Sequence, residues 1–201
     1  MIELVKAGGW PMIPLLLLSL VALAIIVERF WSLRRTAVMP PGLGREVRAW
    51  AAGGDLDPQH IDALRKTSPL GALLAAALDV RHKSREAIRE RVEDTGRHLV
   101  HRMERYLNSL GTIAATGPLL GLFGTVVGMI EIFGSQTPGG GNPAQLAHGI
   151  SIALYNTAFG LMIAIPSLMF YRYFRGKIEE YVLELEAAAD RLLGQLRRYT
   201  A

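Results

Sequence analysis

Three runs without a charged residue dominate this chain of 201 residues. They are Ala7 to Val27, Tyr106 to Ile130 and Gly149 to Tyr171, with 21, 25 and 23 residues. A helix needs about 20 apolar residues to cross the hydrocarbon core of a bilayer. Burying three such helices in a soluble domain would leave too little amphipathic chain to cover them. The sequence therefore predicts an all-α membrane protein with three transmembrane helices.

The basic residues predict the orientation of these helices. Of the 22 Lys and Arg residues, only Lys6 precedes the first span, and the loop from Glu131 to His148 contains none. Because basic residues collect on the cytoplasmic side, the N-terminus and this loop are predicted to lie outside, and the C-terminus inside. The first span ends without a small-residue cleavage site, so it is predicted to be a retained anchor rather than a signal peptide.

Composition excludes several classes of site. The chain has no cysteine, so it has neither disulfides nor thiolate metal sites. No basic patch with interleaved aromatic residues indicates a nucleic-acid partner. No phosphate-binding loop, nucleophile elbow or HExxH motif indicates an enzyme, and no cofactor is expected. His98 and His101 are three residues apart on a predicted helix, but we expect surface positions there rather than metal ligands.

The predicted organisation has seven segments. They are a periplasmic N-terminus (1–9), transmembrane helix 1 (10–31), a cytoplasmic helical region (32–105), transmembrane helix 2 (106–133), a periplasmic loop (134–147), transmembrane helix 3 (148–171) and a cytoplasmic C-terminal helix (172–201). In the cytoplasmic region, a turn at Pro40–Gly42 and breaks at Gly53-Gly54 and Pro58 predict short helices. The pair Ser68-Pro69 is typical of an N-cap followed by proline at the first helical position.

Long helical arms are predicted to continue spans two and three. Nothing breaks the helix between Ser84 and span two, which predicts one continuous helix of 50 residues from Ser84 to Phe133. After span three, apolar residues follow a 4-3 spacing typical of a seam for another helix: Ile178, Val182, Leu185, Ala189, Leu192, Leu196 and Tyr199. Because the loop between the spans is short, we expect an antiparallel hairpin. A surface-bound amphipathic tail is the alternative for the last segment.

Spans two and three each carry a face of small residues, at steps of three and four. These are Ala114, Gly117, Gly121, Thr125 and Gly128, with Gly124 alongside, and Gly149, Ala153, Thr157, Gly160, Ala164 and Ser167. Such faces let membrane helices approach closely, so one interpretation is helix packing alone. However, Pro118 and Pro166 free two backbone carbonyls, which need polar partners inside a membrane. The other interpretation is a surface that lines a wet path or meets a partner helix.

Ionisable side chains other than tyrosine are absent from the interior of spans two and three. Glu131 lies at the outer end of span two. Glu28 and Arg29 are charges at the cytoplasmic end of span one, where Glu28 is expected to pair with Arg29 or Arg34. If protons cross the membrane here, we expect the titrating carboxyl group to come from another chain.

Two long motifs carry a resemblance to a known family. The stretches "GPLLGLFGTVVGMIEIF" (Gly117 to Phe133) and "GISIALYNTAFGLMIAIPSLMFY" (Gly149 to Tyr171) resemble the signature spans of the ExbB/TolQ/MotA proton-channel family, and its ExbB/TolQ branch most. The stretch "ERFWSL" after span one is also similar to that branch. The resemblance implies a homopentamer of three-span subunits in the inner membrane of a Gram-negative bacterium.

The same resemblance implies the partners and the function. Spans two and three would enclose a single-span ExbD- or TolR-like protein whose membrane aspartate carries the proton. Proton-motive force would then drive a TonB- or TolA-like protein that crosses the periplasm, for outer-membrane transport or integrity. The alternative function is a non-conducting, oligomeric membrane scaffold. It is favoured by Ile152, which stands where several members of the family carry glutamate.

Site residues follow from the motifs. Thr125 and Thr157 match the family threonines that face the partner aspartate. Pro118, Pro166, Asn156 and Ser151 are expected along the same proton path. The small residues expected to pack the helices are Gly117, Gly121, Gly124, Gly128, Gly149, Ala153, Gly160 and Ala164.

Overall fold

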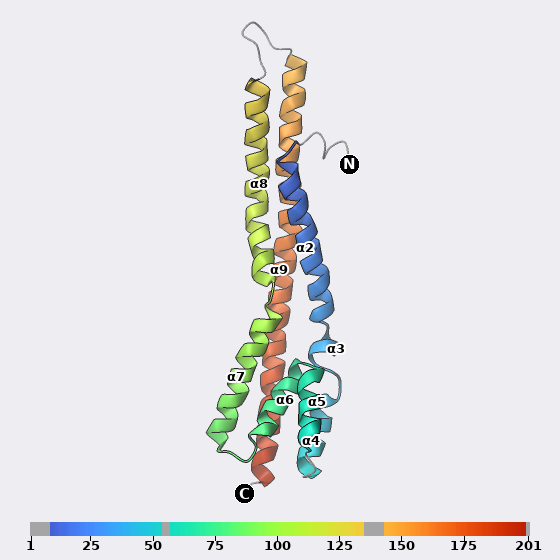
Figure 1. Cartoon of the computed structure of the whole chain (residues 1–201), viewed down its shortest axis with the longest axis vertical. Helices are drawn as coiled ribbons and strands as arrows, with labels where there is room; N and C mark the ends of the chain where they lie inside the picture. Colours follow the sequence, from blue (N-terminus) through green and yellow to red (C-terminus); the bar gives the residue numbers. More distant parts are fainter. Residues whose placement is uncertain (1–8, 54–56, 135–142, 200–201) are drawn as a thin grey trace. The chain divides into compact units, whose positions relative to one another are not determined.

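The computed structural model describes residues 9–53, 57–134 and 143–199, and every regular element in these ranges is a helix (Figure 1). The helices are α2 (Met12–Ser32), α3 (Arg35–Val38), α4 (Leu43–Gly53), α5 (Pro58–Thr67), α6 (Pro69–Asp79), α7 (Arg85–Met103), α8 (Leu107–Gly134) and α9 (Pro143–Tyr199). Three helical stretches, which contain α2, α8 and α9, are long and apolar enough to cross a membrane. The prediction of an all-α protein with three candidate spans is confirmed.

The backbone contacts divide the chain into two compact units. The first comprises the residues up to 28 together with 106–173, and the second comprises 29–105 together with 174–201. The helices α2 and α9 contribute residues to both units. The first unit therefore contains nearly all of the apolar spans, and the second contains the short helices and the charged parts of the long ones.

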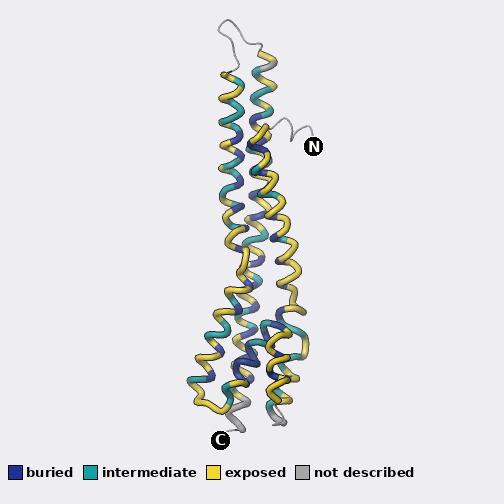
Figure 2. Tube along the Cα trace, viewed as in Figure 1, coloured by how far each residue is buried: buried dark blue, intermediate teal, exposed yellow. Residues whose placement is uncertain are grey.

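Helix α6 forms the centre of the second unit. The Ser68 hydroxyl accepts a hydrogen bond from the Gly71 N–H at 3.0 Å, and Pro69 occupies the first turn, as the sequence predicted. Nearly the whole helix is buried, from Leu70 to Leu78 (Figure 2). A helix that is apolar on all sides must be covered on all sides. The neighbours α3, α4, α5 and α7 provide this cover.

Turn residues end the short helices where the sequence predicted. Between α3 and α4, Gly42 has φ +88°, a left-handed conformation that glycine adopts without steric cost. Helix α4 ends at Gly53 and α5 begins at Pro58, whereas Gly54 lies outside the described residues. The Asp57 carboxylate caps α5 by accepting from the Gln59 N–H at 3.1 Å.

The apolar stripe of α9 packs inside the second unit. Ile178, Leu185, Ala189 and Leu192 are buried, and Val182 is half-buried. The side chains of Leu196 and Tyr199 lie outside the described residues. Over residues 178–192 the stripe is thus a seam between helices, as the 4-3 spacing predicted, and not the surface-bound tail considered as the alternative.

The prediction of one continuous helix from Ser84 to Phe133 is wrong. Helix α7 ends at Met103 and α8 begins at Leu107, and between them Tyr106 has φ +64°. Arg29 is only 3% exposed, and its Nη1 donates a hydrogen bond to the Met103 carbonyl oxygen at 2.9 Å. In an unbroken helix that carbonyl would accept from the Leu107 N–H. A charged donor from α2 therefore caps the end of α7 in its place.

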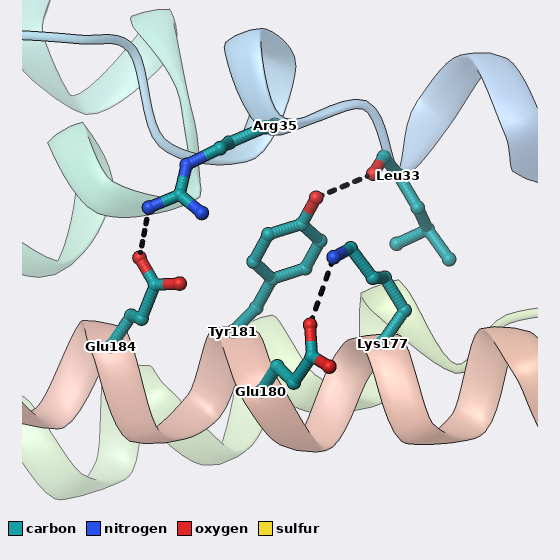
Figure 3. Close-up of polar contacts among 6 residues, drawn as sticks. All are labelled: Leu33, Arg35, Lys177, Glu180, Tyr181 and Glu184. Carbon is teal, nitrogen blue, oxygen red and sulfur yellow. Dashed lines mark hydrogen bonds and ion pairs between the residues drawn. The ribbon is translucent and has the colours of Figure 1, made fainter.

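Two polar contacts, one buried and one exposed, connect the segment after α2 to α9 (Figure 3). The Tyr181 hydroxyl is buried and donates to the Leu33 carbonyl oxygen at 2.9 Å. The ion pair between Arg35 and Glu184, at 2.8 Å, is exposed instead. We expect the buried contact to contribute more to the stability of the second unit, because water competes for the exposed one.

Replacing Tyr181 with phenylalanine is expected to lower the free energy of unfolding by about 1–2 kcal/mol, because the buried Leu33 carbonyl loses its donor. Glu184→Gln is the control and is expected to cost less than about 1 kcal/mol, since its ion pair is exposed. Chemical unfolding of the purified protein in detergent measures both. Equal losses in the two variants would contradict the ranking.

Candidate functional site

In the first unit, α8 and α9 pack side by side and antiparallel (Figure 1). Residues later in α8 contact residues earlier in α9, as antiparallel helices require. The contacting pairs are Gly111 with Tyr171, Gly117 with Gly160 and Ala164, Gly121 with Asn156 and Thr157, Gly128 with Ala153, and Ile132 with Gly149. A Cβ atom at Gly160 would lie 2.5 Å from the Gly117 carbonyl oxygen, which is closer than any side chain tolerates. The two backbones are thus as close as glycine alone permits.

The small faces of the two spans therefore meet each other within one chain. Within this chain they pack against each other, which is the first of the two interpretations given above. Each glycine face fills the other, so that little of either stays accessible. The sides turned away from this contact carry large exposed residues: Leu119, Leu122, Phe123, Val126, Leu161, Met162, Ile165 and Met169.

The two mid-span threonines lie at the edge of this contact and face each other. Their hydroxyl oxygens are 2.5 Å apart, and both residues are half-buried. The Thr125 hydroxyl also lies 3.0 Å from the Ala153 carbonyl oxygen and 3.2 Å from the Gly121 carbonyl oxygen. Because each hydroxyl donates once and accepts twice, the pair retains capacity to accept or donate toward a third group.

Asn156 lies near this hydroxyl pair, and Pro118 lies further along α8 on the same side. Asn156 is 2% exposed and packs against Gly124, where a Cβ atom would lie 2.9 Å from the Asn156 Cβ. Pro118 is half-buried. It lies seven residues before Thr125, which is about two turns along the same helix face.

Ser151 and Pro166 do not join this group. Ser151 is exposed, and its hydroxyl donates to the Ala147 carbonyl oxygen of its own helix at 2.9 Å. Pro166 is also exposed. It is nine residues after Thr157, which places it on the opposite face of α9 at about 100° per residue. The helical repeat therefore separates these two residues from the hydroxyl pair.

A pocket of 290 Å³ lies beside the hydroxyl pair in the first unit. Its lining residues come from the start of the described chain, from α8 and from α9: Gly9, Pro11, Gly124, Val127, Gly128, Glu131, Ile132, Gly149, Ile152, Ala153 and Asn156. From the sequence, Glu131 was expected only at the outer end of span two and not in a site. A signal was present, because Glu131 follows Gly124 by seven residues and so shares its helix face.

The charged residues at the end of span one lie in different surroundings. Glu28 is exposed, whereas Arg29 is buried and bonded to the Met103 carbonyl. The Arg34 guanidinium lies over the Trp31 ring, 4.3 Å from its centre. Among residues 9–53, 57–134 and 143–199, no three His, Asp or Glu side chains cluster as metal ligands would. His98 and His101 are both exposed.

The family model and the similar proteins that match this chain agree on one family. Residues 65–187 match the model of the MotA/TolQ/ExbB proton channel family. An ExbB-like biopolymer transport protein of Synechocystis is 38% identical over 169 residues, which cover 82% of this chain and 66% of that protein. A second ExbB-like protein of Synechocystis is 30% identical over 187 residues, covering 84% and 82%. The biopolymer transport protein ExbB of Salmonella typhimurium is 39% identical over 118 residues, covering 56% and 48%. The chain thus spans just under two thirds of the first of these relatives.

Proposed function

Because this chain belongs to the MotA/TolQ/ExbB proton channel family, in its ExbB/TolQ branch, we propose that it is a channel subunit that converts proton-motive force into mechanical work. Membership in this family is consistent with a membrane protein that serves biopolymer transport. The proposal adds the site of proton transfer, the partners and the location. It assigns the transfer to a carboxyl group of another chain, held by the hydroxyls of Thr125 and Thr157.

The paired hydroxyls are the observation that carries this proposal. They form a polar site in the middle of two spans that carry no charged side chain, and they contact each other at 2.5 Å. A polar group inside a membrane is costly unless it is satisfied, and it is therefore a functional candidate by default. The half-buried position leaves one side of the pair open to a neighbouring helix.

A hydroxyl pair suits a carboxyl group that gains and loses a proton. When the carboxyl is ionised, Thr157 donates its hydrogen to the carboxylate and accepts the hydrogen of Thr125. When the carboxyl is protonated, it donates to the Thr157 oxygen, the Thr157 hydrogen turns toward Thr125, and Thr125 donates to the Ala153 carbonyl. Both charge states keep their hydrogen bonds, so neither is left unsatisfied in a low-dielectric site.

The assembly is proposed to be a pentamer in the inner membrane of a Gram-negative bacterium. In it, the exposed bulky faces of α8 and α9 contact neighbouring copies, lipid and the partner helix. The partner is a single-span, ExbD- or TolR-like protein with a membrane aspartate, and its movement acts on a TonB- or TolA-like protein. The large apolar side chains left exposed on both spans support an assembly of this kind.

Reconstitution tests the proposal directly. Proteoliposomes that contain this chain with its single-span partner are expected to take up protons when a membrane potential is applied, as reported by an internal pH-sensitive dye. The chain without the partner is expected to show only the leak of empty liposomes, since it lacks the carboxyl group. A stable complex without proton flux would overturn the channel and favour the scaffold function.

A further inference from the structure

The pocket beside the hydroxyl pair has a polar group at each end. Glu131 is exposed at its mouth, and Asn156 is 2% exposed at its buried end. The remaining described lining is apolar or glycine, including Val127 and Ile152. A carboxylate and a buried amide at opposite ends of an otherwise apolar space give water molecules the polar partners they need to enter it.

The buried end of the pocket adjoins the two threonines. Gly124 and Asn156 line the pocket, and they directly precede Thr125 and Thr157 in the chain. The Thr125 hydroxyl lies 3.0 Å from the carbonyl oxygen of Ala153, which also lines the pocket. At 290 Å³ the pocket has room for several water molecules between Glu131 and Asn156.

The described residues just before α2 lie beside the pocket and contact α8. Near the start of α2, the Trp10 ring packs edge-on against the Phe123 ring of α8, with ring centres 6.0 Å apart. The pocket-lining residues from this segment, Gly9 and Pro11, are not titratable. From α9, His148 precedes the lining residue Gly149 and is exposed. Glu131 is exposed, so its carboxylate can exchange protons with water.

We propose that this pocket is the outer proton-access path and that the Glu131 carboxylate is its proton-collecting group. This inference rests on the proposed function. The carboxylate takes a proton from outer water and releases it to the water in the pocket. That water passes a proton to the partner's carboxyl at the hydroxyl pair, and Glu131 returns to its ionised form. Asn156 positions the last water and neither gains nor loses a proton.

The test measures proton flux in the proteoliposomes as a function of outer pH. Glu131→Gln is expected to lower the flux at least about tenfold at neutral outer pH, because the amide cannot collect a proton. The loss is expected to shrink in acid, where water itself supplies protons faster. Glu131→Asp is expected to keep most of the flux. Glu90→Gln, an exposed glutamate on α7 outside the pocket, serves as the control and is expected to leave the flux unchanged.

A double variant moves the carboxylate to another position in the same pocket and tests whether flux returns. Ile152 lines the same pocket from α9, so Ile152→Glu in the Glu131→Gln background is expected to restore a large part of the flux. A merely structural role of Glu131 would give an equal loss at every pH and no rescue. Flux in Glu131→Gln equal to that of the unaltered chain would overturn this inference and leave the proposed function standing. Absence of flux in the unaltered complex would overturn both.

Discussion

Thr157→Val is expected to lower proton flux through the reconstituted complex by about tenfold to a hundredfold. Valine keeps the shape of threonine but removes the hydroxyl that donates to the partner's carboxylate. A hydrogen bond to a charged group contributes about 1.5–3 kcal/mol, and each 1.4 kcal/mol corresponds to a factor of ten. Thr125→Val is expected to act similarly, because it also removes the contact of 2.5 Å that orients Thr157. The dye-based flux assay measures both variants.

Thr112→Val is the matched control for the threonine variants. Thr112 lies in α8, the helix of Thr125, and is exposed, and its hydroxyl donates to the Asn108 carbonyl oxygen of the same helix at 2.9 Å. Its replacement is expected to leave flux within about twofold. All three variants are expected to assemble with the partner as the unaltered chain does. If Thr112→Val lowered flux as much as Thr157→Val, loss of a hydroxyl in α8 or α9 would be a general defect and the assigned site would be wrong.

Gly160→Leu is expected to prevent the α8–α9 hairpin from forming. Even a Cβ atom at this position would lie 2.5 Å from the Gly117 carbonyl oxygen, and backbone cannot move aside as a flexible side chain can. Overpacking in a close contact costs about 1–3 kcal/mol, and a leucine between two touching backbones belongs at or above the upper end of that range. The yield of folded protein, its thermal stability in detergent and its oligomeric state by native mass spectrometry provide the measurements. Gly121→Leu is expected to behave alike.

Gly176→Leu is the control that distinguishes disruption of the α8–α9 contact from the effect of replacing a glycine in a helix. It lies on the same helix, α9, but nothing lies within 4 Å of a Cβ atom built there. Because glycine is a poor helix former, its replacement in open space is expected to stabilise the helix by up to about 1 kcal/mol. Gly160→Leu is therefore expected to lower the stability of the protein, and Gly176→Leu to raise it. An unchanged oligomer and stability in Gly160→Leu would refute the close contact.

The spans and the helix ends were predictable because their signals are local. Charge-free runs of sufficient length identified α2, α8 and α9, and Ser68-Pro69 identified the start of α6. The antiparallel pairing of α8 and α9 also followed, since a short connection leaves adjacent helices few alternatives. In each of these cases a few neighbouring residues determine the outcome.

The features that were not predicted depend on residues far apart in the chain. The break at Tyr106 carries neither glycine nor proline, and the carbonyl of Met103 is bound there by a side chain from α2, Arg29. Helical spacing identified the small faces of the spans, but spacing cannot tell which surface meets which. Glu131 was left out of the site because its partner in the pocket, Asn156, lies 25 residues further along the chain.

The glycine contact between α8 and α9 has a consequence for biogenesis. Because the inner surfaces of the hairpin contact each other within one chain, the hairpin can fold before it meets a second copy. Substitutions would then have different effects at different positions. Substitution of the inner glycines would reduce the amount of folded subunit, whereas substitution of the outer leucines and phenylalanines would leave folded monomers that do not associate. In the proposed assembly, folding of each subunit would then precede its association with other copies.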